Sequence, residues 1–549
     1  MTMEIGRWLR DRARATPRRT AIVDAAAAIS YGELDDRSDR LAAGLLAAGA
    51  RRGDRIATLT RNQPEHVDLF FACAKAGLIL TPINVRLTAP EIAYQLADAE
   101  PMLLFAAPEF LPVAREAAKD TAVAELTRAG LDRHAAPGHA DVGDGPGDDA
   151  GLLLVYTSGT TGRPKGALLT HANCFWTNLS LDRGCELRED DVVLQVLPQF
   201  HVGGWNVQPL LAWWKGATVV LEPAFDAGRA LRLIARHRVT TMMGVPATYL
   251  FMSQEPGFAT ADLSSLRRVV VGGAPMPEPL LRVWLDRGVR IVQGYGLTEA
   301  APNVLCLPAE HVADKVGWAG MPYPHVDVAL RDAETGSAID GPGVGELVVR
   351  GPNVFPGYWR NPEATAAAVQ DGWLRTGDIA ERDAAGFYRI RDRLKDMYVS
   401  GGENVYPAEV ESVLQGHPAV AEAAVVGVPD ARWGEVGCAF VVPAADAAAD
   451  PATDSAADSG ADLGRLLVAY CRERLAGFKV PKHVRLIDRL PRSGLDKVLK
   501  TELRDLVLDA EGRDAVRTDE GGDEGRDMAL DAEPRDMART DEGRDRWES

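Results

Sequence analysis

Apolar and polar positions follow two different periods along the first 130 residues. Segment 31–50 (YGELDDRSDRLAAGLLAAGA) has the spacing of an amphipathic helix, whereas 54–60 (DRIATLT) and 78–85 (LILTPINV) are short apolar runs rich in β-branched residues. Such alternation predicts βαβ units and a largely parallel sheet. It continues through 216–223, 239–246 and 266–277. We therefore expect an α/β fold with a large N-terminal domain.

The pattern changes in the second half of the chain. From about Val326, short strands and tight turns such as GELVVRGP (345–352) and GFYRIRDR (386–393) predict a β-rich subdomain. A helix at 407–417 and strands at 420–429 and 437–443 predict a small α+β domain, interrupted by a flexible surface loop at 444–462. The acidic tail repeats EGRD and TDEG, with too few apolar residues to fold. We predict domains at 1–394 and 395–508, and a disordered tail at 509–549.

Composition narrows the class of protein. The 549 residues are 46% hydrophobic and 26% charged, which is typical of a globular chain with more than one domain. No apolar run reaches the ~20 residues of a membrane helix, and the Arg-rich start has no apolar core of a signal peptide. Six cysteines without a CxxC pair suit the reducing cytoplasm. A net charge of −18 argues against nonspecific nucleic-acid binding.

A glycine-rich segment carries the first candidate chemistry. YTSGTTGRPKG (156–166) directly follows the apolar run GLLLV (151–155). Ordering many glycines costs backbone entropy, which close approach to a ligand can offset, and N–H groups, hydroxyls and Lys165 suit phosphates. The spacing is not that of a Walker loop. An ordinary turn is the alternative reading of this segment taken alone.

Two further segments place charged residues near strand ends. In QGYGLTEA (293–300), Thr298 and Glu299 follow an apolar strand, where a carboxylate beside a hydroxyl suits Mg²⁺; a plain helix N-terminus is the alternative. In 373–397, Asp378 follows Gly377 at an expected turn, and Arg393 follows a short strand. An Asp can accept both hydroxyls of a ribose, and an Arg can bind ribose or phosphate.

These segments together resemble the acyl-adenylate-forming superfamily, specifically its acyl-CoA synthetases. The matching motifs run from Tyr156 to Arg504 in the family's order and add GELVVRGPNVFPGYW, DRLKDMYVSGGENVYPAEVE and LPRSGLDKVLKTELR. The resemblance implies an AMP-forming carboxylate–CoA ligase that uses ATP, Mg²⁺ and CoA on a small carboxylic acid. Charge and hydropathy, as given above, predict no nucleic-acid partner and no membrane span. A homodimer is left open.

The resemblance also assigns residues to the nucleotide. Mg²⁺ would be held by Thr298 and Glu299, and the ribose by Asp378 and Arg393. Adenine would lie between the Gly273–Ala274 segment and Tyr295. The pyrophosphate end of ATP would be held by Thr157, Ser158, Gly159, Thr160, Thr161, Gly162 and Lys165.

The same resemblance makes the C-terminal domain mobile. Lys497 would contact the carboxylate and ATP during adenylation, and rotation about a hinge at Lys395 would then withdraw it. Asp496 stands where the family usually has Gly, and could pair with Lys497. The rotated domain would offer a thiol channel and the CoA site. The assigned CoA residues are Arg86, Gly401, Gly402, Trp433, Phe478 and Lys479, with Lys482 as an alternative because Val480 replaces an Arg of the pattern.

The acyl group has its own candidates. His201 of PQFHVGGWN would be a gate or wall of the acyl pocket, shared with Trp205, Val271, Gly296 and Ala300. The small residues at 296 and 300 predict room for a sizeable apolar acid, whether fatty, aryl or more specialised. Alternatives to a complete CoA ligase are an enzyme limited to thioester formation, or an adenylating enzyme that loads a carrier protein.

Overall fold

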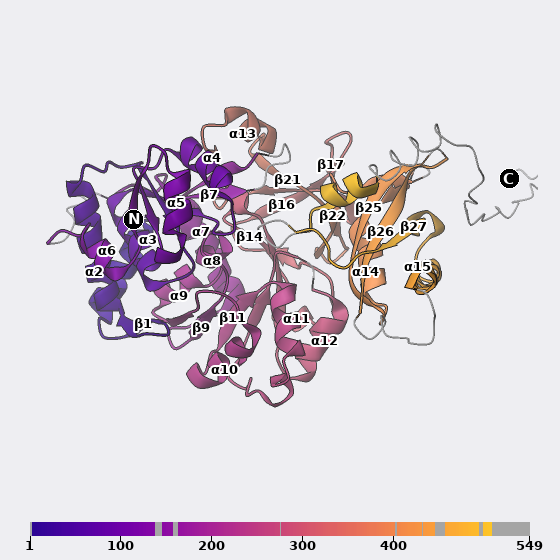
Figure 1. Cartoon of the computed structure of the whole chain (residues 1–549), viewed down its shortest axis with the longest axis horizontal. Coiled ribbons are helices and arrows are strands. Elements are labelled where there is room, and N and C mark those ends of the chain that lie inside the picture. Colours follow the sequence, from indigo (N-terminus) through magenta and orange to yellow (C-terminus); the bar gives the residue numbers. More distant parts are fainter. Residues whose placement is uncertain are drawn as a thin grey trace, which may run out of the picture.

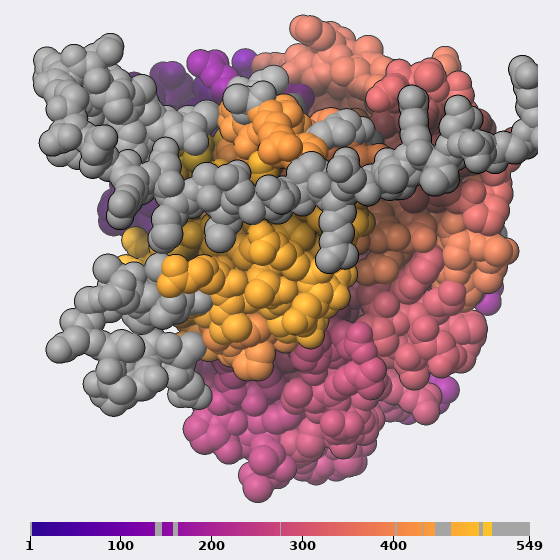
Figure 2. All heavy atoms as spheres, turned by 90° about the vertical axis from the view of Figure 1, so that its right-hand side faces the viewer, coloured from indigo at the N-terminus to yellow at the C-terminus, as the bar shows by residue number. Residues whose placement is uncertain are grey.

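The computed structural model describes residues 3–137, 145–157, 163–274, 276–400, 403–430, 432–444, 456–492 and 498–507. The chain forms a large unit up to β22, and a smaller unit that begins at β23 and lies at the far end of the long axis (Figure 1). Figure 2 looks onto the smaller unit, whose orange and yellow residues form one body in front of the large unit. The predicted α/β class is confirmed.

The first sheet is ordered β19-β8-β7-β4-β3-β5-β6. Strands β3 to β7 pair in parallel, and β8 turns back antiparallel to β7. The connecting helices bury their apolar stripes against it, and α2 starts at a capping box of Ser30 and Glu33. The strands are β3 (Arg55–Leu59), β4 (Ile79–Ile83), β5 (Leu103–Ala106), β6 (Ala122–Glu125), β7 (Gly151–Thr157), β8 (Lys165–Thr170) and β19 (Gly357–Tyr358).

The second sheet is ordered β15-β14-β13-β12-β11-β9-β10-β1-β2, with a parallel centre from β13 to β1. Its carboxyl edge at β13 is where ligands of such sheets gather. The strands are β1 (Thr20–Val23), β2 (Ala28–Ser30), β9 (Val192–Gln195), β10 (Thr218–Leu221), β11 (Thr241–Gly244), β12 (Val269–Val271), β13 (Ile291–Gly296), β14 (Asn303–Cys306) and β15 (Met321–Pro322).

Helices surround these two sheets (Figure 1). None in the described ranges is both long and apolar enough to span a bilayer. The α-helices of the large unit are α1 (Ile5–Ala15), α2 (Tyr31–Ala47), α3 (Pro64–Ala76), α4 (Ala89–Ala99), α5 (Leu111–Ala117), α6 (Arg128–Asp132), α7 (His171–Cys185), α8 (Gly203–Asn206), α9 (Pro209–Lys215), α10 (Ala227–His237), α11 (Pro246–Gln254), α12 (Glu278–Asp286) and α13 (Pro362–Ala368).

The β-rich region expected after Val326 is an antiparallel sheet ordered β17-β16-β18-β21-β20, with β22 also on β21. It is the part of the large unit that leads into the smaller unit, so the segment before Lys395 belongs to this sheet. The strands are β16 (Asp327–Arg331), β17 (Ala338–Ile339), β18 (Gly343–Arg350), β20 (Val369–Gln370), β21 (Trp373–Arg382) and β22 (Tyr388–Arg393).

The smaller unit has a sheet ordered β24-β23-β26-β25, with β27 parallel to β26. Its elements are β23 (Tyr398–Ser400), β24 (Glu403–Val405), α14 (Pro407–Gln415), β25 (Val420–Asp430), β26 (Gly434–Pro443), α15 (Ala456–Arg472) and β27 (His483–Leu486). The expected loop at 444–462 is wrong in its second part, because residues 456–462 begin α15. That stretch contains three alanines, the strongest helix formers, and leads into an amphipathic segment. The tail 509–549 lies outside the described residues.

Candidate active site

The first polar groups of the site stand at the end of the β7–β8 pair. Thr157, the last residue of β7, lies directly opposite Lys165, the first residue of β8. The register therefore brings one hydroxyl and one ammonium group, the two flanks of the glycine-rich segment, to one edge of the sheet. The residues between them that were assigned to phosphates lie outside the described residues: Ser158, Gly159, Thr160, Thr161 and Gly162.

The carboxylate of Glu299 lies at the same edge. Glu299 follows the end of β13 in a short 3-10 helix, Thr298–Ala300. Its Oε1 accepts hydrogen bonds from the Tyr358 hydroxyl at 2.8 Å and the Thr157 hydroxyl at 3.4 Å. The Nζ of Lys165 lies 5.3 Å from the centre of the Tyr358 ring. Four residues from three distant segments of the chain thus form one polar cluster.

Thr298 and Glu299 fit the chemistry of a Mg²⁺ site. Both are half-buried, and hydroxyl and carboxylate oxygens are the hard ligands that this ion prefers. Within the described part of the chain, hydrogen bonds reach only Oε1 of Glu299, which leaves Oε2 for a ligand. The same part holds no group of three or more His, Cys, Asp or Glu suited to a metal. The residues therefore suit an ion that brings phosphate oxygens with it.

A second polar cluster surrounds Asp378. Its Oδ1 lies 2.6 Å from Nε of Arg393, and its Oδ2 accepts a hydrogen bond of 2.5 Å from the Tyr295 hydroxyl. The Asp378 side chain is only 3% exposed, whereas that of Arg393 is 41% exposed. Burial, followed by the charge of Asp378, raises the pKa of Tyr295 well above its usual value. The phenol therefore stays protonated and donates to the carboxylate.

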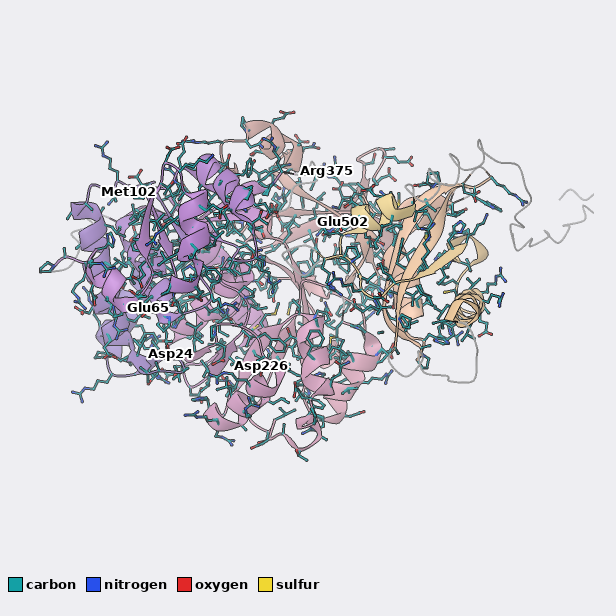
Figure 3. All side chains as sticks on the ribbon, in the orientation of Figure 1. Asp24, Glu65, Met102, Asp226, Arg375 and Glu502 are labelled. Carbon is teal, nitrogen blue, oxygen red and sulfur yellow. The ribbon has the colours of Figure 1, made fainter. Side chains whose placement is uncertain are left out.

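The expected turn before Asp378 is wrong, because Asp378 lies inside the long strand β21. The register between β18 and β21 shifts between Glu346 and Val348, and Gly377 has a φ of 67°. These features mark a β-bulge, which re-aims a side chain without ending the strand. Buried Glu346 stabilises the bulge, because its carboxylate accepts a hydrogen bond from the Gly377 N–H at 3.2 Å. The same carboxylate forms an ion pair of 2.5 Å with Arg375, a residue labelled in Figure 3.

The segment assigned to adenine is held by Gln293. Gly273, with a φ of 80°, and Ala274 are exposed just beyond β12. The side chain of Gln293 donates to the Ala274 carbonyl at 3.3 Å and accepts the Met276 N–H at 3.1 Å. Tyr295, two residues further along β13, belongs to the Asp378 cluster. Both sides of the proposed adenine site are thereby tied to the end of β13.

Sequence reasoning gave no role to three of these residues, namely Gln293, Glu346 and Tyr358. Each stands inside a quoted motif: Gln293 opens QGYGLTEA, and the other two belong to GELVVRGPNVFPGYW. The motifs were the signal that could have pointed to these residues. They did not show which residue each side chain contacts, because the Tyr358–Glu299 hydrogen bond spans 59 residues and the Glu346–Gly377 hydrogen bond spans 31.

The residues assigned to the acyl pocket differ in exposure. His201 is half-buried beside Phe200, and burial, with a smaller effect of Arg86, lowers its pKa to about 4. Trp205 is fully buried and stacked on Phe70, and Val271 and Ala300 are also fully buried. A Cβ at Gly296 would lie 1.8 Å from the Pro302 carbonyl oxygen, so the backbone itself requires glycine there. The acyl assignments stay predictions.

The CoA assignments fall on two separate surfaces. In the smaller unit, Trp433 is 38% exposed and has the ammonium of Lys482 5.2 Å from its ring. Both lysines are ion-paired, Lys482 with Asp430 at 3.4 Å and Lys479 with Glu409 at 2.8 Å, and Phe478 packs on the core of that unit. Arg86 is exposed on the large unit, where its charge reaches His201. Gly401 and Gly402 lie outside the described residues.

The structure describes the predicted hinge, Lys395, but not the adenylation lysine, Lys497. Lys395 is exposed in the turn between β22 and β23, where the chain leaves the large unit. Three residues before it, Asp392 at the end of β22 accepts a hydrogen bond from the Ala408 N–H at 2.7 Å, which joins β22 to α14 of the smaller unit. Asp496 and Lys497 lie outside the described residues. The hinge and the lysine stay predictions.

Comparison with known proteins places this arrangement in a family. Residues 9–359 match the AMP-binding enzyme family, and residues 409–497 match the AMP-binding enzyme C-terminal domain. The chain belongs to the AMP-binding enzyme family. This AMP-binding enzyme is 45% identical to a feruloyl-CoA synthase of Amycolatopsis sp. over 91% of its own length and 98% of the relative's. It is 39% identical to an indoleacetate–CoA ligase of Aromatoleum aromaticum, over 92% and 98% of the two chains.

A solved structure shares the fold of this AMP-binding enzyme. The o-succinylbenzoate-CoA synthetase MenE of Bacillus subtilis, in complex with its acyl-adenylate intermediate, superposes with a TM-score of 0.80. The two chains are 34% identical over 90% of this chain and 97% of that one. The same synthetase has also been solved with ATP and a magnesium ion. The predicted family, the acid–thiol ligase class and the use of ATP, Mg²⁺ and CoA are confirmed at the level of the family.

Proposed function

We propose that this AMP-binding enzyme joins an apolar, aryl-substituted carboxylic acid to CoA through an acyl-adenylate. One observation carries the nucleotide part of the proposal. Tyr295 and Glu299, four residues apart at the end of β13, belong to two polar clusters, one built on Asp378 and Arg393 and one on Thr157 and Lys165. A ribose bound at the first cluster would direct its phosphates toward the second.

The residues of the first cluster would bind the nucleoside. Asp378 is held in place by Arg393 and Tyr295, and its carboxylate can accept the two ribose hydroxyls. Because these partners already fix the carboxylate, little side-chain entropy is lost when ATP binds. Ala274 and Tyr295 would enclose the adenine ring.

The residues of the second cluster would reduce the electrostatic repulsion between the acid and ATP. In the first step an oxygen of the acid attacks the α-phosphorus and pyrophosphate leaves, so two anions must approach each other. Lys165 and Lys497 would offset that repulsion by preorganised positive charge, which acts most strongly in a water-poor site. Mg²⁺, bound through Thr298 and Glu299, would supply Lewis-acid polarisation of the phosphate oxygens.

In the second step the CoA thiol attacks the acyl carbonyl and AMP leaves. A lysine still bound at the acyl group would obstruct the thiol, which is why we propose that the unit after Lys395 rotates, with domains at 1–394 and 395–508. Trp433 and Lys482 would then offer a ring and a cation to the nucleotide end of CoA. This exposed pair favours CoA over a carrier protein as the acceptor.

The class of carboxylic acid substrate is inferred from the names of the relatives and from the uncharged state of His201, which we assign to the wall of the acyl pocket. Feruloyl-CoA synthase and indoleacetate–CoA ligase are both named for acids that carry an aromatic ring. His201, with its pKa lowered to about 4, is uncharged at neutral pH and suits an apolar acyl group. We also infer a cytoplasmic enzyme, since all six cysteines are free thiols. The homodimer stays a prediction.

A panel of acids tests this proposal. Ferulate, indoleacetate, palmitate, o-succinylbenzoate and acetate would each be supplied with ATP, Mg²⁺ and CoA, with no carrier protein present. Pyrophosphate release and thioester formation would be scored separately. We expect the highest kcat/KM with an aryl acid, and equal amounts of thioester and AMP. Preference for acetate would refute the aryl assignment, and pyrophosphate release without thioester would refute CoA as the acceptor.

A further inference from the structure

The dipeptide Gly357–Tyr358 forms a strand of its own, although it lies more than 180 residues from its partner. This strand, β19, pairs antiparallel with β8, with Tyr358 opposite Ala167 and Gly357 opposite Leu168. The Trp359 N–H continues the ladder to the Gly166 carbonyl at 2.7 Å. The pairing delivers the side chain of Tyr358 to the edge where the glycine-rich segment ends.

Local contacts fix the backbone of Tyr358 in that place. Its N–H donates to Oγ1 of Thr365, the fourth helical residue after the Asn361 cap of α13, at 2.9 Å. A Cβ on Gly357 would lie 2.5 Å from Cγ2 of the same threonine, so this close approach requires glycine. The strand is therefore set by packing that involves no charged group of the site.

The hydroxyl of Tyr358 then acts on Glu299. It donates to Oε1 at 2.8 Å, while the Phe355 N–H donates to the Glu299 backbone carbonyl at 2.9 Å. One carboxylate oxygen is thereby held, while no hydrogen bond among the described residues reaches the other.

The ring of Tyr358 acts on the neighbouring cation. Nζ of Lys165 lies 5.3 Å from the ring centre, within the range of a cation–π contact. Phe355 packs edge-on against the same ring at 4.9 Å and limits its rotation. A single side chain thus touches both the acid and the cation of the phosphate-side cluster.

We propose that Tyr358 is a positioning residue that holds Glu299 and Lys165 ready for Mg²⁺-bound ATP. This inference rests on the proposed function, and it gives a role to the Gly-Tyr-Trp part of the motif GELVVRGPNVFPGYW. Replacing a residue that orients a metal-binding carboxylate typically weakens metal affinity by about tenfold to a hundredfold. Tyr358 would therefore affect binding before any chemistry takes place.

The test measures metal binding in the absence of acid and CoA. Mn²⁺ is the probe, followed by electron paramagnetic resonance with a non-hydrolysable ATP analogue and the full chain. A protein-free sample gives the Mn²⁺ that the analogue binds by itself, which is subtracted. Tyr358→Phe removes only the hydroxyl and keeps the ring, the strand and the Lys165 contact. Tyr470→Phe is the matched control, because its hydroxyl donates at 3.2 Å to the Gly416 carbonyl in the smaller unit, away from this cluster.

We expect Tyr358→Phe to raise the dissociation constant of Mn²⁺ about tenfold, while Tyr470→Phe leaves it unchanged. In Glu299→Gln, where Mn²⁺ binding is already weak, adding Tyr358→Phe should have little further effect, because the hydroxyl acts through Glu299. Wild-type Mn²⁺ affinity in Tyr358→Phe, or a full tenfold loss on top of Glu299→Gln, would overturn the inference. A wild-type protein that binds no Mn²⁺ with the ATP analogue would instead refute the proposed function.

Discussion

Asp378 and Arg393 lie directly opposite each other on β21 and β22 and are joined by an ion pair of 2.6 Å between Oδ1 and Nε. The same sheet contains a second cross-strand pair of the same two residue types, Asp327 on β16 and Arg350 on β18. The two pairs differ in burial, since both members of the second pair are more than half exposed, whereas Asp378 is buried. The pair with the buried aspartate is the one that also receives a hydrogen bond from the Tyr295 hydroxyl.

We expect Asp378→Asn to raise the KM for ATP between about tenfold and a hundredfold. Hydrogen bonds to charged groups contribute about 1.5–3 kcal/mol, and the amide can no longer accept on both oxygens. Asp327→Asn is the matched control and should leave the KM for ATP unchanged, because an exposed ion pair contributes little. Steady-state kinetics at saturating acid measure both, and an equal effect of the two substitutions would contradict the assignment of Asp378.

His201 gives a prediction about pH. The pKa of about 4 in the folded protein lies below the ordinary 6.5, so the imidazole is neutral above pH 5.5. We expect His201→Asn to lower kcat/KM for the acid by the same factor at every pH from 5.5 to 8. Below pH 6.5 the unfolded chain binds this proton more readily than the folded one, so His201 makes stability fall as the pH drops toward 4. An activity ratio that changes around pH 6.5 would show that His201 titrates during catalysis.

Restricting Lys395 should separate the two half-reactions. Lys395→Pro fixes φ at the exposed turn between β22 and β23, and the domain rotation that we propose would have to change it. Formation of the acyl-adenylate should persist, while thioester formation falls at least tenfold. Lys395→Ala keeps the turn free and is the control. Pyrophosphate exchange measures the first step and thioester chromatography the second; two unchanged rates would place the hinge elsewhere.

Lys497→Ala should have the opposite effect. Loss of this cation removes the charge that offsets carboxylate–phosphate repulsion, and we expect adenylation to lose about 3–4 kcal/mol or more of transition-state stabilisation. Thioester formation from a supplied acyl-adenylate should be nearly unchanged.

Asp496→Gly tests whether the neighbouring acid already impairs Lys497. We expect little change in pyrophosphate exchange, and a marked rise would mean that the natural enzyme adenylates poorly.

The sequence predicted those features that depend on local patterns. The βα alternation, the β-rich region after Val326 and the position of Thr298 and Glu299 after a strand all follow from periodicity and turn residues. The site residues that stood in motifs could be named, but their partners could not. Whether Asp378 follows a turn or a bulge depends on Glu346, which is distant in sequence and binds Gly377 only in the folded sheet.

Errors in the sequence interpretation also have physical causes. Residues 456–462 have a low-complexity composition that suggested a loop, but their alanines favour the helix that continues to Arg472. Gly296 also has a steric reason that its motif does not show, because a Cβ there would lie 1.8 Å from the Pro302 carbonyl oxygen; its place in the acyl pocket stays a prediction.

Isotope transfer tests the central claim most directly. The full chain is given a carboxylic acid labelled with ¹⁸O in both carboxylate oxygens, together with unlabelled ATP, Mg²⁺ and CoA, and the AMP is analysed by mass spectrometry. If an acid oxygen attacks the α-phosphorus and stays with it when the thiol displaces AMP, the AMP must carry one ¹⁸O atom. We predict this labelled AMP in equal amount to the thioester. Unlabelled AMP, or ADP with label in free phosphate, would contradict the acyl-adenylate route.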